Sequence, residues 1–495
     1  MKNTSQFKFN KISRILFIHP PGNRVIRKDG ERGMKACVQP VGLAYLASFI
    51  REKGFETVIL DCAAEGYDEP EIELEPEIFR YGLSDDKIIR YLEDYKPDLV
   101  CISCPQLVRI PEAITVANLS KKIYPKVPVV MGGASVSTLG IEFFSLTNDV
   151  DYIIRGEGEQ RLYDLIQALN STPSQLSLLD GLIYRDGDAI IENPFVSVIQ
   201  NIDDLPLPAY DLLPMNIYFE KNRNPSVHSS AQRSCTMISS RGCPVKCYYC
   251  PVHKVFGPTG PNYRMRSNEN VLNEIELLTS RYDVQEIQFE DSNFNSSIAR
   301  TMSLSHAIGE RFSGLRWTTP HGNQMSTLTP EVLSAMKKGG CYSLHLALES
   351  GNQEFLEKRK KSVKLSKVDL LLEQAKEEGF VRSAFFMIGF PEENRENIAR
   401  TINYADSIDI DDIHFFIAIP FPNTEIYDIC KQNGWLIPNI SWRHFRYSVG
   451  VIKTEHFDPA YLQTVRRNAW LKIRRRLEKK EHAVLLSKNE KEIYG

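Results

Sequence analysis

The stretch Ser239-Ser-Arg-Gly-Cys-Pro-Val-Lys-Cys-Tyr-Tyr-Cys250 holds three of the ten cysteines of this chain, in the spacing C-x3-C-x2-C. It follows a strand-like run that begins at Thr236, so the cysteines are expected in the loop after a β-strand. Gly242 and Pro244 suit a sharply turning loop. Because a [4Fe–4S] cube usually takes four ligands, three thiolates in one loop would leave one iron with an open position, where chemistry can take place.

The same cysteines allow a second interpretation, a structural zinc site. Zinc needs four ligands, and His253 follows Cys250 closely enough to supply the fourth. No second C-x2-C and no histidine pair follows at the spacing of a zinc finger. The spacing therefore favours the iron–sulfur cluster.

The segment C-x3-C-x-(aromatic)-C, with Tyr249 before its last cysteine, resembles the signature of the radical S-adenosylmethionine (SAM) superfamily. In that family the open iron binds the amino and carboxylate groups of SAM. One electron from the cluster then cleaves SAM to methionine and a 5′-deoxyadenosyl radical. The resemblance implies Cys243, Cys247 and Cys250 as cluster ligands and a SAM contact at Tyr249.

Length and composition describe an ordinary protein of more than one domain. At 495 residues the chain exceeds the size of a single core, and its net charge of −3 argues against broad nucleic-acid binding. It opens without the apolar core of a signal peptide, and no run approaches the ~18 apolar residues of a membrane span, so we expect no stable membrane insertion. Its cysteines outside the triplet are scattered, which fits reduced thiols in an oxygen-poor cytoplasm.

Residues 11 to about 170 alternate between short apolar runs and segments with helical spacing. Arg14-Ile-Leu-Phe-Ile-His19, ended by Pro20-Pro-Gly22, is typical of a buried parallel strand and its loop. The alternation predicts an α/β fold with a doubly wound parallel sheet of the Rossmann or flavodoxin type, which binds ligands at the carboxyl ends of its strands. We expect strands at 14–19, 57–60, 99–103, 127–131 and 152–154, helices at 40–54, 85–95, 112–124 and 159–169, and a hairpin over 182–192.

The loops at these strand ends, taken in order, resemble the cobalamin-binding domain that precedes many radical SAM domains. The resemblance lacks the D-x-H-x-x-G motif, and His19 is the only histidine before position 228, so it implies cobalamin without a protein histidine on the cobalt. We expect His19 to position a turn. A sheet that presents substrate without any cofactor is the alternative. The implied cobalamin contacts are Pro21, Gly22, Pro105, Gln106, Gly132, Gly133, Ser135, Gly156, Glu157 and Gly158.

Cys101-Ile-Ser-Cys104 raises the question of a second cluster, like the one that methylthiotransferases carry in an N-terminal domain. Those proteins use three spaced cysteines, and Cys37 and Cys62 are the only other candidates here. Strand alternation places Cys101 and Cys104 on opposite faces of the sheet. We therefore expect packed thiols.

A proline-rich segment, residues 203–214, separates this half from a second βα alternation. Three prolines in it exclude a helix and predict a stiff linker. Beyond it we expect strands at 236–239, 286–289, 316–319, 343–347, 382–387 and 414–419, and helices at 271–279, 297–310, 331–338, 367–378 and 395–408. This pattern predicts a partial (βα)6 barrel with its chemistry at the carboxyl ends of the strands. The predicted domains are 1–200, a linker at 201–232, a barrel at 233–440 and a C-terminal extension at 441–495.

Polar or glycine-rich loops follow the predicted barrel strands. One carboxylate after a strand is often only a helix N-terminal residue favoured by the helix dipole, but several on one face favour ligand contact. The second-strand motif is Phe-Glu-Asp-Ser where the family has Gly-Gly-Glu, so the atom that binds the SAM amino group stays open. The resemblance implies SAM contacts at Tyr249, Glu290, Asp291, Ser292, Glu349, Ser350, Gly389 and Glu392, whereas Tyr263, His321, His345, Cys341 and Cys430 are expected to be structural.

The tail from Asp458 carries Arg466-Arg467, Arg474-Arg-Arg476 and Lys479-Lys480 interleaved with Trp470, Leu471 and Leu477. This spacing predicts an amphipathic basic helix. We expect it to pack against the barrel with a solvated basic face. Contact with an anionic lipid or a phosphorylated substrate is the alternative.

Together the resemblances imply a cobalamin-dependent radical SAM enzyme like the class B methyltransferases, with a [4Fe–4S] cluster, SAM and cobalamin as cofactors. In such enzymes the radical removes hydrogen from an unactivated carbon, which then receives a methyl group. A small-molecule or lipid-like substrate and an electron donor such as flavodoxin or ferredoxin are the implied partners. A radical cyclisation or rearrangement without methyl transfer, and a non-catalytic cobalamin sensor, are the alternatives. The sequence identifies no catalytic residue.

Overall fold

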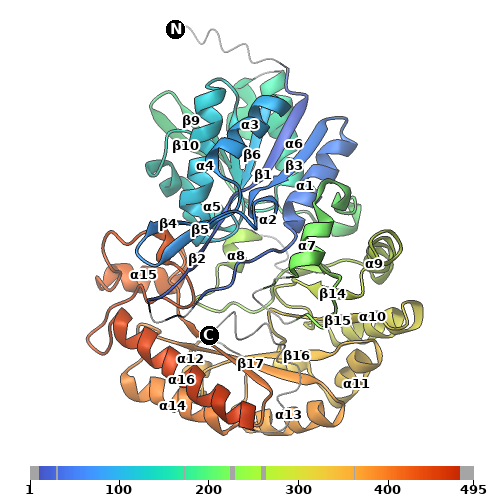
Figure 1. The fold of residues 1–495 in the computed structure, drawn as a ribbon, viewed down its shortest axis with the longest axis vertical. Coiled ribbons are helices and arrows are strands. Elements are labelled where there is room, and N and C mark those ends of the chain that lie inside the picture. The colour runs from blue at the N-terminus through green and yellow to red at the C-terminus, as the bar shows by residue number, and fades with distance from the viewer. Residues whose placement is uncertain are drawn as a thin grey trace.

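A computed structural model describes residues 11–28, 30, 32–171, 173–222, 224, 229–257, 263–359, 361 and 363–479 (Figure 1). It consists of an N-terminal α/β part, drawn in blue to teal, and a second α/β part below it, drawn in yellow to red. The fold class predicted from the sequence is confirmed.

The N-terminal sheet runs in the order β10-β9-β8-β7-β6-β1-β3. The segment from β8 to β3 is parallel, and its strands, numbered along the chain, have the 2-1-3-4-5 order of flavodoxin-like sheets. Such a sheet has its switch point between β1 and β6, and the predicted hairpin, β9 and β10, extends the other edge. The strands are β1 (Arg14–His19), β3 (Glu56–Asp61), β6 (Leu99–Ser103), β7 (Val129–Gly132), β8 (Tyr152–Ile154), β9 (Leu182–Asp186) and β10 (Ala189–Glu192).

Helices cover both faces of this sheet, as a doubly wound topology requires. Apolar side chains of α1 and α6 share one buried cluster, and those of α3 and α4 belong to another, so the strands are apolar on both faces. The helices are α1 (Val41–Glu52), α2 (Cys62–Glu65), α3 (Asp85–Tyr95), α4 (Ile110–Ile123), α5 (Ala134–Leu139) and α6 (Glu159–Asn170), with 3-10 turns at Leu107–Arg109, Gly140–Ser145 and Pro173–Leu178. The sequence did not predict a small antiparallel sheet of β2 (Gly22–Val25), β4 (Ile72–Glu75) and β5 (Ile78–Tyr81).

The second part contains parallel strands in two sheets, β11-β14-β15 and β16-β17-β18. Isolated bridges from Trp317 to Cys341 and from Asn323 to Leu346 join β15 to β16 and make the sheets one curved, partial barrel. The strands are β11 (Ser234–Met237), β14 (Glu286–Phe289), β15 (Arg316–Thr318), β16 (Ser343–Glu349), β17 (Val381–Ile388) and β18 (Asp412–Ile417).

Helices follow the barrel strands and cover their outside (Figure 1). Their starts carry the capping chemistry that the sequence indicates: the Thr329 hydroxyl accepts from the backbone N–H of Val332, with Pro330 at the first helical position. The helices are α9 (Asn268–Tyr282), α10 (Ile298–Arg311), α11 (Pro330–Lys338), α12 (Gln353–Lys358), α13 (Val368–Glu377), α14 (Arg395–Ser407) and α15 (Glu425–Gln432), with 3-10 turns at Met325–Thr327, Leu365–Lys367 and Trp442–His444.

The proline-rich segment is a packed joint, which differs from the expected spacer. It forms 3-10 turns at Ile202–Asp204 and Tyr210–Leu212, followed by α7 (Met215–Lys221). The Tyr210 ring is 1% exposed, and its hydroxyl donates to Glu274 of α9 at 2.6 Å. One buried apolar cluster includes residues of both α/β parts and of this segment. The two parts therefore share a core.

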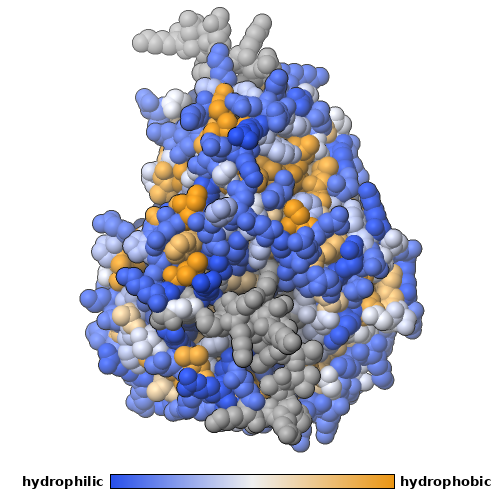
Figure 2. Space-filling model, in the orientation of Figure 1, coloured by the Kyte–Doolittle hydropathy of each residue, from blue (hydrophilic) through white to orange (hydrophobic). Residues whose placement is uncertain are grey.

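The predicted basic helix is α16 (Pro459–Lys479), which lies along the barrel beside α14 (Figure 1). Leu462, Ile473 and Leu477 are buried on its inner side, as expected for a helix that packs on the barrel. The last lysine of the predicted basic face, Lys480, lies outside the described residues. Figure 2 shows a largely hydrophilic surface with scattered apolar patches, and no helix within the described ranges is long and apolar enough to cross a membrane.

Candidate functional site

The three cysteines of the signature lie in the loop after β12 (Ser240–Gly242), a short strand that pairs with β13 (Tyr263–Met265). All three are partly exposed, whereas the other cysteines are buried free thiols. Burial raises the pKa of Cys250 to about 12, and the proximity of Cys247 and Cys243 adds to the increase. The three sulfur atoms therefore lie within electrostatic range of each other.

This arrangement fits a cluster better than a single metal ion. Within the described ranges, no three His, Cys, Asp or Glu side chains converge to hold one ion. The thiolates of a cubane bind different iron atoms, so they surround a volume and need not converge. His253 Nε2 lies 2.9 Å from the Val245 carbonyl oxygen, which holds the ring inside the loop. The donor set and its spacing thus fit the [4Fe–4S] cluster.

Glu349 connects the fourth barrel strand to the cluster loop. It lies at a register shift at the end of β16, with φ of 68°, and its carboxylate accepts from the Tyr249 hydroxyl at 3.1 Å and from Lys361 Nζ at 2.9 Å. Tyr249 and Glu349, both predicted SAM contacts, are therefore brought together beside the cysteines. Burial raises the pKa of Tyr249 well above its usual value, and Glu349 adds to this, so the phenol stays protonated.

Glu290, at the end of β14, forms a second paired carboxylate. It accepts from Asn224 Nδ2 at 3.0 Å and contacts His321 Nε2. Burial alone would raise the pKa of Glu290, but the charge and hydrogen bond of His321 lower it. His321, expected to be structural, has its pKa raised by the same carboxylate. The pair lies at the inner mouth of the barrel and lines the cavity described below.

Other predicted SAM contacts are held by the protein itself. Asp291 is 2% exposed and accepts from Ser239 and Ser240, so it fixes the strand end that precedes the cluster loop. Ser350 is fully buried, and its hydroxyl pairs with that of Thr401. Ser292, in contrast, is exposed to the cavity.

The turn after β17 contains a buried carboxylate that the sequence did not single out. Glu393 is 0% exposed and accepts from the backbone N–H groups of Gly389 and Phe390 at 2.8 and 3.0 Å. The predicted contact Glu392 is more exposed and pairs with Arg359 at 2.6 Å and with Tyr248 at 3.2 Å. Gly389, with φ of 82°, has no room for a Cβ beside Leu462.

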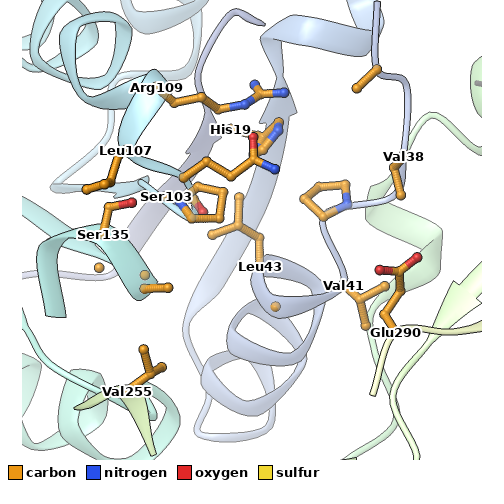
Figure 3. A pocket seen from close by; sticks show the side chains of 18 of the residues that line it. His19, Val38, Val41, Leu43, Ser103, Leu107, Arg109, Ser135, Val255 and Glu290 are labelled. Carbon is orange, nitrogen blue, oxygen red and sulfur yellow. The ribbon is translucent and has the colours of Figure 1, made fainter. Parts of the chain in front are cut away.

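A cavity of about 860 Å³ lies between the carboxyl edge of the N-terminal sheet and the mouth of the barrel. It occurs at the switch point, where doubly wound sheets bind ligands. From the barrel side it is lined by Glu290, Ser292 and His321, and near the cluster loop by Pro251 and Val255. Figure 3 shows Leu43 and Val41 on one side, Ser135 and Leu107 on the other, and His19 and Arg109 at the end of the cavity.

Most predicted cobalamin contacts lie on this cavity, although Pro21 and Gly22 are not among its lining residues. Gly133, with φ of 111°, requires glycine because a Cβ would lie 2.7 Å from the carbonyl oxygen of Cys104. Cys101 and Cys104 are buried in different apolar clusters, as strand alternation predicts. The predicted contacts on the cavity are Pro105, Gln106, Gly132, Gly133, Ser135, Gly156, Glu157 and Gly158.

Glu157 also has a structural task, because buried ion pairs connect it to the barrel part. Its carboxylate accepts from Arg241 at 2.9 Å and from Arg264 at 2.8 Å, and Glu159 pairs with Arg241 at 2.6 Å. All four side chains are at most 9% exposed. Since Arg241 and Arg264 belong to the β12–β13 hairpin, these pairs fix the cluster loop against the sheet.

Sequence reasoning missed several lining residues. Arg109 follows the Cys104-Pro-Gln-Leu107 loop, and Phe445, Arg446 and Tyr447 belong to the C-terminal extension, which has no motif. The cavity is thus completed by a third segment of the chain. The proximity of Arg109 to a strand-end loop was the only sequence signal for any of these residues.

Comparison with known families gives two matches in chain order. The B12 binding domain family matches residues 33–166, and the Radical SAM superfamily matches residues 237–405. The cysteine loop lies in the second segment, and most residues that line the cavity lie in one or the other.

Relatives with known names cover nearly the whole chain. An uncharacterized methyltransferase of Pyrococcus horikoshii is 30% identical over 93% of this chain and 92% of its own. The cytidylyl-2-hydroxyethylphosphonate methyltransferase of Streptomyces wedmorensis is 27% identical over 89% of this chain and 86% of its own. An anaerobic magnesium-protoporphyrin IX monomethyl ester cyclase of Rubrivivax gelatinosus is 22% identical over 90% of this chain and 74% of its own.

The fold is also shared with a solved structure. The radical SAM methyltransferase TsrM of Kitasatospora setae, with cobalamin and a [4Fe–4S] cluster bound, superimposes with a TM-score of 0.66 at 19% identity over 86% of this chain and 79% of that one. With the two family matches and the near full-length relatives, this establishes that the chain belongs to the radical SAM superfamily, in the branch that carries a cobalamin-binding domain before the barrel.

Proposed function

We propose that this protein is a C-methyltransferase that transfers a methyl group to an unactivated carbon of a small molecule. The observation that supports this most is the shared cavity. Glycine-rich loops of the cobalamin-binding part and the Glu290–His321 pair of the barrel line the same space, which reaches the cluster loop at Pro251. Methyl transfer to a carbon radical needs the methyl donor, the radical source and the substrate in one water-excluded space.

The residues present fit the three cofactors of the family. We propose Cys243, Cys247 and Cys250 as the cluster ligands, and Tyr249, Glu349, Glu290 and Ser292 as the SAM-binding set. The loops Gly132–Ser135 and Gly156–Gly158, with Pro105 and Gln106, would contact the corrin. When bound, these groups supply one-electron cleavage of SAM and a transferable methyl group. The chain itself positions them and excludes water.

We propose the same domain division as the sequence predicts. A cobalamin-binding domain covers 1–200, a linker 201–232, a barrel 233–440 and a C-terminal extension 441–495. The chemistry of the superfamily requires a one-electron reductant, and we propose a flavodoxin or ferredoxin in that role. All cysteines of the chain are free thiols in the described structure, which agrees with the proposed cytoplasmic location. A substrate with an anionic or polycyclic character would match those named for the relatives.

The test is anaerobic reconstitution with iron, sulfide and cobalamin, followed by quantification of 5′-deoxyadenosine and S-adenosylhomocysteine with candidate substrates. Methyl transfer predicts both products in equal amounts together with a methylated compound. A product formed with deoxyadenosine alone would instead identify a cyclase or rearrangement enzyme, the chemistry suggested by the cyclase relatives.

The matched variants for this test are Cys243→Ala/Cys247→Ala/Cys250→Ala and Cys430→Ala, which removes a buried thiol of α15. The triple variant should lose the cluster absorbance and all deoxyadenosine, and Cys430→Ala should keep both. If the triple variant kept the full function of the wild type, that function would not depend on the cluster. The protein would then be a cobalamin-binding sensor or scaffold.

A further inference from the structure

We propose that Arg109, Arg446 and His19 form a phosphate-binding site at one end of the cavity. The anion is either the phosphodiester in the nucleotide tail of the corrinoid or a phosphate group of the substrate. The three side chains come from separate elements: the end of β1, the 3-10 turn Leu107–Arg109, and the C-terminal extension. All line the same cavity. Figure 3 shows the guanidinium of Arg109 next to the ring of His19.

Neither arginine has a carboxylate partner in the described part of the chain. Arg109 is 7% exposed, and its Nη1 donates to the carbonyl oxygens of Pro20 at 2.9 Å and Pro21 at 3.4 Å. Arg446 donates from Nε to the Arg443 carbonyl at 2.7 Å and contacts Asn23 with Nη2. Both guanidinium groups therefore keep donors for a ligand. Unused guanidinium donors on a cavity wall suit an anionic ligand.

His19 provides an independent indication of a ligand. His19 is 8% exposed, and its buried Nδ1 has no hydrogen-bond partner among the described residues. Buried polar atoms nearly always have a partner, so an unpartnered imidazole on a cavity wall points to a group that binds there. Burial, and then the charge of Arg109, lower the pKa of His19, so the ring is neutral and can donate one hydrogen bond.

Among the described residues, the nearby carboxylates form no ion pair with Arg109 or Arg446 and contact Arg443 instead. Glu75 and Glu112 pair with Arg443 at 2.7 and 2.8 Å. Burial, together with the repulsion from Arg109, lowers the pKa of Arg446 to about 10 even though Glu112 and Glu75 oppose this. A guanidinium with a lowered pKa lacks a compensating charge.

Asp61 on the same cavity is also satisfied within the protein. It accepts from the backbone N–H groups of Ala63 and Ala64 and from the Tyr218 hydroxyl at 2.6 Å. Asp61 therefore accepts from neither arginine, whose remaining donors stay available to a ligand.

The geometry of the donors favours phosphate over carboxylate. One guanidinium fork is enough to bind the two oxygens of a carboxylate. Here two forks and an imidazole approach from three elements, which suits the tetrahedral oxygens of a phosphate. The inference rests on the cofactor set of the family and is independent of methyl transfer, so it is tested by binding without turnover.

The test measures equilibrium binding of cobalamin and of cobinamide, which has the corrin but no nucleotide phosphate, to the cluster-loaded full chain. Arg446→Met and Arg109→Met are compared with Arg311→Met, which removes an exposed arginine of α10. If the site binds the corrinoid phosphodiester, the first two variants weaken cobalamin about 10- to 100-fold and leave cobinamide unchanged. If it binds a substrate phosphate, both corrinoids bind normally, and inorganic phosphate raises the melting temperature of the wild type and Arg311→Met only.

Two results would overturn the proposal: Arg446→Met and Arg109→Met behave like Arg311→Met in every titration, or they lose both corrinoids equally. Arg446→Lys keeps the charge and should recover most of the binding, whereas a variant with merely disturbed packing would not be rescued. Near-ultraviolet circular dichroism verifies folding. If Arg446→Met does not fold, Arg446→Gln, which also removes the charge, replaces it with the same expected order of affinities.

Discussion

The two rims of the cavity are built in opposite ways. On the barrel side, charged side chains already have partners in the protein: Glu290 on the cavity is paired with His321, and Glu349, which does not line the cavity, is paired with Lys361. On the sheet rim, glycines such as Gly132 and Gly156 present mostly backbone. A small charged ligand such as SAM is oriented by fixed charges, whereas a large flat ligand such as a corrin needs close approach of the backbone. The contrast suggests one rim for each ligand.

The sheet rim has one feature that contradicts this simple division, the buried pair of Glu157 with Arg264. It tests whether the two rims are one rigid unit. Glu157→Gln leaves Arg264 without a carboxylate, and we expect a loss of about 3–5 kcal/mol in the free energy of unfolding. Denaturant unfolding of the apoprotein measures it. The matched control Glu192→Gln breaks a more exposed pair with Arg155 and should cost less than about 1 kcal/mol.

The same variant should loosen the cluster loop, since Arg264 lies in β13, which pairs with β12, and the loop lies between these two strands. We expect Glu157→Gln/Arg264→Met to recover part of the stability, because no charge is then left unpaired. Equal stability of Glu157→Gln and the wild type would mean that the rims are joined by the apolar core alone.

Glu393 is the exception among the carboxylates at the barrel strand ends, because backbone N–H groups hold it and no cation pairs with it within the described residues. Burial raises its pKa to about 8, and the nearby Glu392 adds to the increase while Arg359 opposes it. The folded state therefore binds a proton that the unfolded state releases near pH 4.5. Its contribution to stability is complete below that pH and is lost as the pH rises to about 8, with a slope of at most about 1.4 kcal/mol per pH unit.

Glu393→Gln should keep the two N–H contacts and remove this pH dependence. Melting temperatures of both proteins between pH 5 and pH 9 give the measurement. The melting temperature of the variant should increase relative to that of the wild type as the pH rises. If the melting temperatures of the two proteins changed in parallel with pH, Glu393 would not titrate between pH 5 and pH 9. It would then be no exception among the barrel carboxylates.

The comparison of Glu349 with Glu392 tests which paired carboxylate binds SAM. Both were predicted contacts, but the Glu349 side chain is 12% exposed beside the cluster loop and Glu392 is 33% exposed. We expect Glu349→Gln to weaken SAM binding about tenfold, because a charged hydrogen bond to the amino group is lost. Glu392→Gln should change it less than about threefold. Equilibrium binding of SAM at equal iron content measures both, and a larger effect at Glu392 would reverse the assignment.

The sequence predicted the order of strands and helices because both halves follow apolar periodicity closely. It also identified the cluster loop, since three thiols at fixed spacing are a local signal. Glu392 was chosen over Glu393 because the sequence does not tell which of two adjacent carboxylates turns into the core. That choice depends on how the turn after β17 is closed by its own N–H groups.

What the sequence could not predict comes from distant segments. Arg109 and Arg446 are far apart in the chain and meet only because the extension folds back over the edge of the sheet. Neither lies in a motif, and only the strand-end loop beside Arg109 gives a local signal for either of them. Likewise the sequence places Tyr210 in a stiff linker, and only the fold brings Glu274 of α9 beside its hydroxyl.

The smallest expected effect tests the sheet rim directly. At Gly132 the nearest heavy atom to an added Cβ would be the Ile154 carbonyl oxygen at 3.7 Å, which is ordinary contact, so Gly132→Ala should fold normally and be as stable as the wild type or slightly more so. If the corrin approaches this backbone closely, the methyl group should weaken cobalamin binding a few fold, roughly 0.5–1 kcal/mol. Gly133→Ala is not equivalent, because its Cβ would collide with Cys104 and the variant would lose stability first. Spectroscopic titration of both variants with cobalamin separates the two effects, and wild-type affinity in Gly132→Ala would show that the corrin lies away from β7.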